Sequence, residues 1–340
     1  MNEKLKRISF LDGLRGVAIL MVILFHAYAR WPDLVPYGNR YGEIVLFKYG
    51  WLGVYLFFMI SGFVILMTLE KTTNFFQFIY HRWIRLFPAM FIVSILVFTT
   101  AHLLFPERPA GVPVIRDLLP GLTFIDDQIL SKIFHYPQGM LEGAFWSLYV
   151  EVKFYIIFGL IFFAFGENVA IAGIIGLFLC FILTGHLGRL SAQYMGWFAS
   201  GAIYYIYFKY GKKKWLWMAL SMSLISALFL HRGILATLVA VIMSLFFLFV
   251  MISQHLQSII SSRFLLFLGF ISYPLYLIHE NMMISLIIKF GRWMPWMPGF
   301  ILPIVPIVIV ISIGWILAKY AEPRFRGLLR GILEKKTVKL

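Results

Sequence analysis

The sequence predicts an all-α integral membrane protein built as a bundle of about ten transmembrane helices. Of its 340 residues, 61% are hydrophobic and only 13% are charged, and the mean hydropathy is +0.87. The charged residues separate apolar runs of about 20 residues, which is the length of a helix that crosses a bilayer. This composition excludes an ordinary soluble globular chain.

Ten apolar spans follow from the hydropathy pattern. They cover residues 9–29, 50–69, 84–105, 142–165, 169–187, 191–208, 215–231, 233–252, 264–288 and 299–320. An even number of spans puts both termini on one side of the membrane. With both termini in the cytoplasm, the short basic loops face inward, as the positive-inside rule requires. We therefore predict a multi-pass protein of the cytoplasmic (inner) membrane with both termini cytoplasmic.

The chain is predicted to be a single transmembrane domain over residues 1–340. Residues 322–340 are expected to form a short basic cytoplasmic tail against the inner leaflet, and we expect neither a signal peptide nor an appended soluble domain. The single cysteine, Cys180, excludes an intrachain disulfide. The net charge of +15 is spread between the spans, so it serves as a topology signal and does not predict binding of nucleic acid.

The first span carries three ionisable residues, Asp12, Arg15 and His26. On an α-helix, a spacing of eleven residues is almost three whole turns, so Arg15 and His26 share a face and lie about 16 Å apart along the axis. Ionisable groups inside a membrane are costly and mark a functional site by default. Asp12 and Arg15, three residues apart, can also be an interfacial pair that helps to start the helix.

The second and third spans contribute a hydroxyl and two arginines. Ser61, next to Gly62 in the middle of its span, is read first as a packing residue, since small residues let helices approach closely. Arg82 and Arg85 are three apart at the expected cytoplasmic start of the third helix, next to its amino terminus. That arrangement can bind phosphates, although positive-inside anchoring also places arginines there.

The fourth and ninth spans add a carboxylate and a second histidine. Glu151 lies five residues after Trp146, and His26 lies five residues before Trp31. If both tryptophans mark the outer aromatic belt, the two side chains share a depth about 7 Å below the interface. A carboxylate beside a histidine can fix its tautomer and raise its basicity. For His279, a packed hydrogen-bonded role and a catalytic role both stay open.

Patterns that would indicate a metal site or a nucleotide-binding loop are absent from the sequence. Three classes of function remain open. The first is an enzyme that uses the buried histidine. The second is a transporter or flippase of a glycan or small anionic substrate, for which buried charge would line the pathway. The third is a non-enzymatic assembly or sensor subunit.

Five stretches in this order resemble the acyltransferase-3 family of membrane O-acyltransferases. They are LDGLRGVAILMVILFHA, GWLGVYLFFMISGFVI, FIYHRWIRLFPA, FWSLYVEVKFY and LGFISYPLYLIH. The first contains the family's pattern of arginine, ten residues and histidine as Arg15 and His26. The third contains its paired arginines as Arg82 and Arg85. Where many relatives have two adjacent acids in the fourth-span motif, Glu151 is followed here by Val152 and Lys153.

The resemblance implies transfer of an acetyl or other short acyl group from cytoplasmic acyl-coenzyme A to a hydroxyl of a cell-envelope glycan, such as lipopolysaccharide or exopolysaccharide. It implies essential roles for Arg15 and His26 and links Arg82 and Arg85 to the donor. No tightly bound cofactor and no metal is expected. The expected partners are acyl-coenzyme A, a free or lipid-linked glycan and membrane lipids.

On this basis His26, oriented by Glu151, is the expected general base. Ser61, Tyr149 and His279 are candidate hydrogen-bond donors to the oxyanion of the tetrahedral intermediate. Direct attack by the acceptor and a covalent acyl-histidine or acyl-serine route both remain open.

Overall fold

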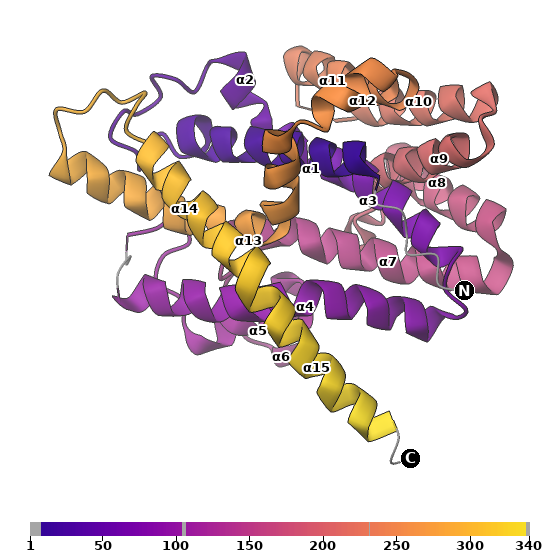
Figure 1. The fold of residues 1–340 in the computed structure, drawn as a ribbon, viewed down its shortest axis with the longest axis horizontal. Helices are drawn as coiled ribbons and strands as arrows, with labels where there is room; N and C mark the ends of the chain where they lie inside the picture. The colour runs from indigo at the N-terminus through magenta and orange to yellow at the C-terminus, as the bar shows by residue number, and fades with distance from the viewer. Residues whose placement is uncertain (1–7, 104–106, 231, 338–340) are drawn as a thin grey trace. The chain divides into compact units, whose positions relative to one another are not determined.

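The computed structural model describes residues 8–103, 107–230 and 232–337, with side chains described to residue 332. All regular elements among these residues are helical (Figure 1). The predicted cytoplasmic termini, residues 1–7 and 338–340, lie outside the described residues, so their sidedness stays a prediction.

The α-helices, in chain order, are α1 (Ser9–Phe25), α2 (Val45–Lys48), α3 (Gly53–Leu69), α4 (Phe75–Leu103), α5 (Leu118–Thr123), α6 (Asp127–Phe134), α7 (Trp146–Phe165), α8 (Glu167–Thr184), α9 (Met195–Tyr210), α10 (Lys213–Leu228), α11 (Ile234–Ile252), α12 (Gln254–Ile260), α13 (Arg263–Trp293), α14 (Ile304–Ile316) and α15 (Glu322–Thr337). Two π-helical turns, η1 (His26–Arg30) and η7 (Leu317–Ala321), follow α1 and α14. Short 3-10 turns are η2 (Gly50–Leu52), η3 (Ile115–Asp117), η4 (Gly143–Phe145), η5 (Gly188–Leu190) and η6 (Ala192–Tyr194).

The all-α membrane class predicted from the sequence is confirmed. Eight helical segments among the described residues are long and apolar enough to cross a membrane. The other two predicted spans coincide with α9 and α10, which have 16 residues each. Such a helix is about 24 Å long, short of a hydrocarbon core of about 30 Å. The number of ten spans therefore stays a prediction.

The chain divides into two compact units. Unit 1 comprises the described parts of residues 1–20, 51–78 and 150–270, and unit 2 those of residues 21–50, 79–149 and 271–340. The chain passes from one unit to the other five times, inside the helices α1, α4, α7 and α13 and inside the 3-10 turn η2.

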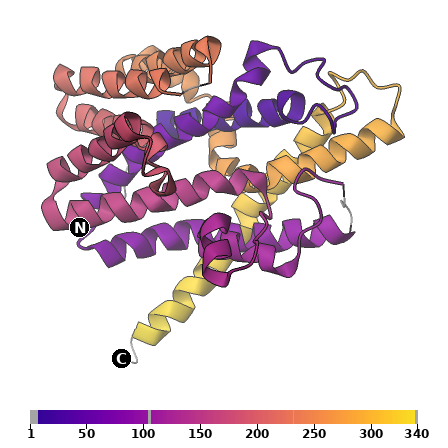
Figure 2. The same ribbon diagram turned by 180° about the vertical axis from the view of Figure 1, so that it is seen from behind.

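Unit 1 is built around α9. Residues from Met195 to Ile206 are all buried, and α9 packs against α3, α8 and α10. Helices α8 to α11 lie side by side in both views (Figures 1 and 2). The rings of Phe58 and Phe154 both stack on Phe198, with centroids 4.6 and 4.2 Å away. The helix ends at Tyr210 because Gly211, at φ +67°, caps it in the left-handed conformation.

Helices α3 and α9 touch through their backbones. A Cβ atom on Gly62 would collide with the carbonyl oxygen of Phe198, and one on Gly201 would collide with that of Met59. Only glycine permits this approach, which places small residues at the helix–helix contact as expected for membrane bundles. The expected packing role of the Ser61–Gly62 position is thus seen at Gly62.

Unit 2 contains the carboxyl-terminal part of α4, most of α13 and the loops between the helices. The Tyr273 hydroxyl on α13 donates to the Leu86 carbonyl on α4, 2.8 Å away. Tyr28 on η1 stacks between Phe47 and Phe300, with centroids 4.5 and 5.5 Å away, and its hydroxyl donates to the Phe300 carbonyl. These contacts hold the 31–49 and 294–303 loops together.

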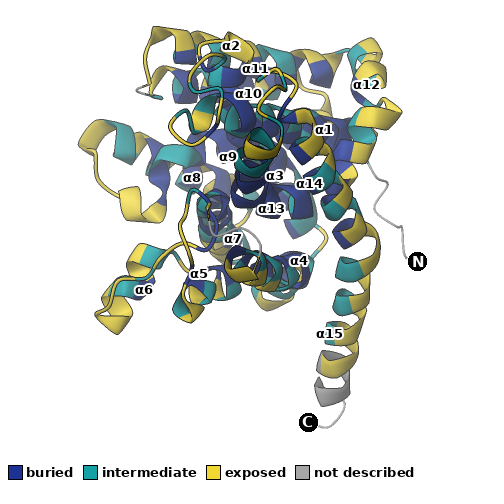
Figure 3. Ribbon diagram, turned by 90° about the vertical axis from the view of Figure 1, so that its left-hand side faces the viewer, coloured by how far each residue is buried: buried dark blue, intermediate teal, exposed yellow. Residues whose placement is uncertain are grey.

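The segment predicted to be a short basic tail, from residue 322, begins with the helix α15. The π-helical turn η7 joins α14 directly to α15, and Phe325 of α15 stacks on Phe91 of α4 with centroids 5.2 Å apart. Most described residues of α15 are exposed or half-buried (Figure 3). Arg324 and Arg330 are exposed, so they are available for the inner-leaflet contact that the sequence suggests.

The close contact between α3 and α9 should make Gly62→Ala and Gly201→Ala destabilising, because overpacking of this kind costs about 1–3 kcal/mol. The melting temperature of detergent-purified protein, followed by loss of the monodisperse gel-filtration peak, measures the effect. Gly176→Ala on α8, where a Cβ has open space, is the matched control. Equal melting temperatures for the three variants would contradict the backbone contact.

Candidate active site

The regular α-helix of α1 ends immediately before His26. Residues from His26 to Arg30 form the π-helical turn η1, which is wider than an α-turn and is frequent at functional sites. His26 is the first residue of this turn, and its Nδ1 lies 2.9 Å from the Val22 carbonyl. No sequence pattern in this stretch predicted the π-turn.

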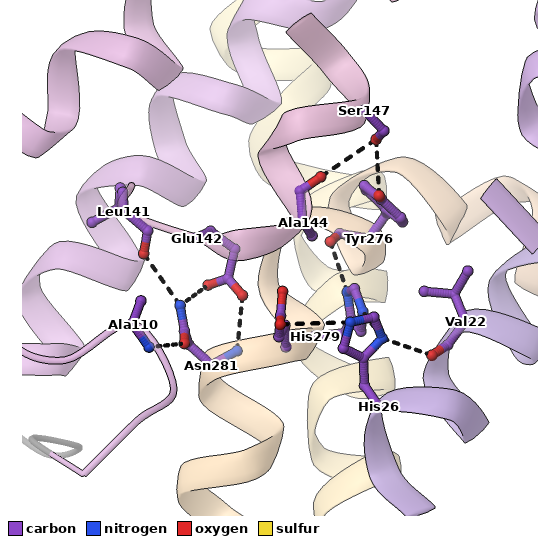
Figure 4. Close-up of polar contacts among 11 residues, drawn as sticks. Val22, His26, Ala110, Leu141, Glu142, Ala144, Ser147, Tyr276, His279 and Asn281 are labelled. Carbon is purple, nitrogen blue, oxygen red and sulfur yellow. Dashed lines mark hydrogen bonds and ion pairs between the residues drawn. The ribbon is translucent and has the colours of Figure 1, made fainter. Parts of the chain in front are cut away.

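His26 meets His279, which comes from the middle of α13. Nδ1 of His26 is 3.1 Å from Nε2 of His279, and the two rings are nearly perpendicular, with centroids 4.6 Å apart (Figure 4). His279 is fully buried. Its own Nδ1 lies 2.8 Å from the Tyr276 carbonyl, one turn back on α13. Both histidines are therefore anchored to the backbone of the helices that carry them.

These partners assign the tautomers. Nδ1 of His279 faces a carbonyl oxygen, so it carries the hydrogen and Nε2 is the lone-pair nitrogen. Nδ1 of His26 then faces two acceptors, the Val22 carbonyl and His279 Nε2, so it must carry a hydrogen as well. The basic nitrogen of neutral His26 is therefore Nε2.

A carboxylate lies opposite that basic nitrogen. Oε1 of Glu280 is 3.6 Å from Nε2 of His26, so the two form an ion pair whenever His26 is protonated. The Glu280 carboxylate packs against the backbone of Gly143, where an added Cβ would lie 2.6 Å from Oε2. This close fit holds the carboxylate in place.

A second buried carboxyl group belongs to Glu142, the residue that directly precedes Gly143 in the sequence. Its two oxygens accept from the backbone N–H and side-chain amide of Asn281, at 2.8 and 2.9 Å (Figure 4). Burial, followed by repulsion from Glu280, raises the pKa of Glu142 to about 8; the hydrogen bonds from Asn281 and the charge of Arg108 oppose the rise. Glu142 is thus mostly protonated at neutral pH.

The sequence predicts the paired arginines next to the amino terminus of their helix. In the structure they lie further along α4, so this prediction is wrong. The helix begins at Phe75, so Arg82 lies at the end of its second turn and Arg85 in its third, where backbone N–H groups bond within the helix. Arg82 is buried. Arg85 interacts electrostatically with Glu322, the first residue of α15. Glu322 also forms an ion pair with Arg326. A donor-binding role for the arginines must therefore rest on their side chains alone.

Three of the predicted supporting residues, Trp146, Tyr149 and His279, belong to unit 2, which also contains His26. His279 contacts His26 directly. Tyr149 is buried and Trp146 half-buried on the first turn of α7. His279 is a poor candidate for the oxyanion donor, because its one N–H is directed at the Tyr276 carbonyl. Its position gives it the role of orienting His26.

The remaining predicted residues belong to unit 1. Arg15 donates to Asp12 at 2.6 Å, the local pair considered from the sequence. The hydroxyls of Ser61 and Tyr155 both donate to the same oxygen, Oε1, of Glu151. Because the Ser61 hydroxyl is engaged in this way, it is not directed at an oxyanion. The predicted action of Glu151 on His26 stays a prediction, and in unit 2 the facing carboxylate is Glu280.

Sequence reasoning missed Glu280, Asn281 and Glu142 as site residues. Glu280 and Asn281 follow His279 directly, and an acid within a span is by itself a signal of function. Glu142 had no comparable signal, because an acid that ends a long loop is ordinary in sequence.

The comparisons with known proteins bear on this geometry. The sequence model of the acyltransferase-3 family, described as an acyltransferase domain, matches residues 8–319. The chain belongs to the acyltransferase-3 family. The family resemblance found in the sequence motifs is thereby confirmed.

Relatives of this acyltransferase-3 chain include the O-acetyltransferase OatA of Staphylococcus aureus strain NCTC 8325 / PS 47. The two are 27% identical over 161 residues, which is 44% of this chain and 24% of OatA. OatA of Staphylococcus aureus strain COL matches with the same values. The aligned region thus spans about a quarter of the length of these curated relatives. No solved structure matches the chain.

The raised pKa of Glu142 makes stability depend on pH. Its folded pKa, about 8, exceeds the ordinary value of 4.5, so the folded state binds more protons between these values. The contribution of Glu142 to the free energy of unfolding is full below about pH 4.5 and is lost as pH rises to about 8. The melting temperature of wild type should therefore fall over this window.

Glu142→Gln, which cannot ionise, should reduce that fall. Asp33→Asn, at an exposed loop position, is the control and should leave the slope unchanged. Parallel pH dependences of melting temperature for wild type and Glu142→Gln would show that Glu142 ionises normally.

Proposed function

We propose that this chain is an O-acyltransferase of the cytoplasmic membrane that moves an acetyl or other short acyl group from cytoplasmic acyl-coenzyme A to a hydroxyl of a cell-envelope glycan. The observation that carries the proposal is the histidine site: Nδ1–H of His26 is fixed by Val22 and His279, and Nε2 is left as the proton acceptor. Membership of the acyltransferase-3 family and the name of the O-acetyltransferase relatives support the reaction class.

The reaction follows from these groups. His26 Nε2 takes the proton of the acceptor hydroxyl as its oxygen attacks the thioester carbonyl. When the tetrahedral intermediate collapses, the carbon–sulfur bond breaks and the imidazolium returns the proton to the departing thiolate. Glu280, 3.6 Å from Nε2, stabilises the imidazolium between these steps. The products are the O-acyl ester and free coenzyme A, with no net proton change.

The charges that would bind the donor are Arg82, Arg85 and Arg15. Guanidinium groups suit phosphates because they donate several parallel hydrogen bonds. On an ideal helix, Arg15 lies about 16 Å from His26, a distance that an extended pantetheine arm can span. Acyl-coenzyme A would keep its phosphates near Arg82 and Arg85 while its thioester reaches His26, which belongs to the same unit.

Replacing His26 tests the proposal directly. Detergent-purified His26→Ala should release no free thiol from radiolabelled acetyl-coenzyme A above background and transfer no label to acceptor, at unchanged protein level. His102→Ala is the matched control, because His102 makes the same bond to a carbonyl four residues back without a partner histidine. Full transfer by His26→Ala would end the general-base role. Counterflow without thioester cleavage by wild type would indicate a transporter.

Replacing both Arg82 and Arg85 by glutamine should weaken coenzyme A binding about tenfold or more, because charge-assisted hydrogen bonds to phosphate are lost. Isothermal titration calorimetry of purified protein measures the affinity, and the melting temperature reports whether the fold survives. The control is Arg324→Gln together with Arg330→Gln, at exposed positions of α15. Wild-type affinity in the Arg82/Arg85 variant would leave these arginines as topology anchors only.

A further inference from the structure

Asn281 uses its backbone N–H and every polar atom of its side chain in unit 2. Its backbone N–H and its amide nitrogen donate to Glu142, and the amide nitrogen is also 3.2 Å from the Leu141 carbonyl. Its amide oxygen accepts from the Ala110 backbone N–H at 3.2 Å. Asn281 is 2% exposed and Glu142 fully buried. Buried polar groups satisfied to this extent specify one arrangement, because any other leaves them unpaired.

The contacts join segments that are far apart in sequence. Ala110 lies in the loop after α4, Glu142 directly precedes η4, and Asn281 is two residues beyond His279 on α13 (Figure 4). Arg108 reinforces the junction by donating to the Leu141 carbonyl at 2.8 Å. The loop ends are thereby fixed against the turn of α13 that carries His279 and Glu280.

This junction also fixes Gly143, the residue after Glu142. Because an added Cβ on Gly143 would reach 2.6 Å from Glu280 Oε2, the backbone at Gly143 forms one wall of the Glu280 carboxylate. Displacing Glu142 would therefore move the Gly143 backbone away from Glu280. The Glu280 carboxylate would then no longer be held 3.6 Å from His26 Nε2.

We propose that Glu142 and Asn281 are positioning residues for catalysis, which hold Gly143 against Glu280 and so keep the Glu280 carboxylate opposite the basic nitrogen of His26. The inference rests on the proposed function, since it assigns these residues to the same histidine site. Neither residue touches the reacting atoms.

The charges around the pair fit this role. Charged and titratable groups from several elements surround Glu142 and Glu280. They are His279 on α13, Arg108 in the loop after α4, Asp117 on η3, and Arg30 and His26 on η1. Two carboxylates ionised in one buried site repel each other, so a neutral Glu142 leaves Glu280 as the single negative charge facing the imidazolium.

The test compares Glu142→Gln with Glu142→Ala in the purified full-length chain, with thiol release from acetyl-coenzyme A as the assay. Gln keeps the size and neutrality of the protonated acid but only one of its two acceptor oxygens, so one hydrogen bond from Asn281 is lost and we expect kcat to fall about three- to tenfold near pH 6.5, less than in Glu142→Ala. Ala removes the contact with Asn281, and we expect kcat to fall about 10- to 100-fold, as small misplacements of catalytic groups do. KM for acetyl-coenzyme A should not change in either variant.

The pH profile separates positioning from mere loss of folded protein. In Glu142→Ala the acid limb of the kcat/KM profile should move about 1 pH unit lower, because His26 loses an opposing charge. Glu280→Gln should move it the same way, whereas Glu142→Gln, which keeps one of the two hydrogen bonds from Asn281, should move it less. A uniform loss of activity in Glu142→Ala with an unshifted limb would overturn the proposal.

If Glu142→Ala does not fold, Gly143→Ala provides the second variant, since it disturbs Glu280 while leaving the Glu142–Asn281 contact in place. It should show the same lower kcat and the same shifted acid limb, and a wild-type pH profile would overturn the proposal.

Hydrogen exchange is a measurement independent of activity. In Glu142→Ala the Asn281 and Ala110 amides should lose protection, and unchanged protection would refute the junction. Absence of thiol release by wild type would instead refute the proposed function.

Discussion

The contact between His26 and His279 is the interaction on which the rest of the site depends. Two neutral imidazoles can share one hydrogen bond only if one donates and the other accepts. The Tyr276 carbonyl makes His279 the acceptor, and this leaves His26 with its hydrogen on Nδ1 and its lone pair on Nε2. The backbone of α13 thus decides which nitrogen of a residue on another helix is basic.

The same constraint extends outward from the histidines. A basic nitrogen that becomes charged inside a membrane protein needs an opposite charge nearby, and Glu280 meets that need. A carboxylate in such a place needs fixed walls, which Gly143 supplies. Gly143 in turn is set by Glu142 and Asn281, whose hydrogen bonds are complete. Each of these buried polar groups needs a hydrogen-bond or charge partner, and the next residue in this series supplies it.

The sequence singles out His26 and His279 as candidates but does not indicate that they contact each other. His26 stood out because a histidine deep in an apolar span is costly, and the same reasoning noted His279. Depth below the interface points to Glu151, which stays a prediction, and within unit 2 the carboxylate that faces His26 is Glu280. Depth estimated from tryptophans gives one coordinate of a side chain, and it says nothing about direction around the helix. The arginine pair was misplaced relative to its helix start because the polar residues before Arg82 are helical too.

The membrane class, most of the apolar helices and the family can be read from the sequence alone, because hydrophobic length and motif order are local properties of the chain. The π-turn at His26, the contact between the two histidines and the positions of Glu280, Glu142 and Asn281 are visible only in the folded chain. These features depend on distances between atoms on different helices and loops. Such distances are set by packing, which no single stretch of sequence encodes.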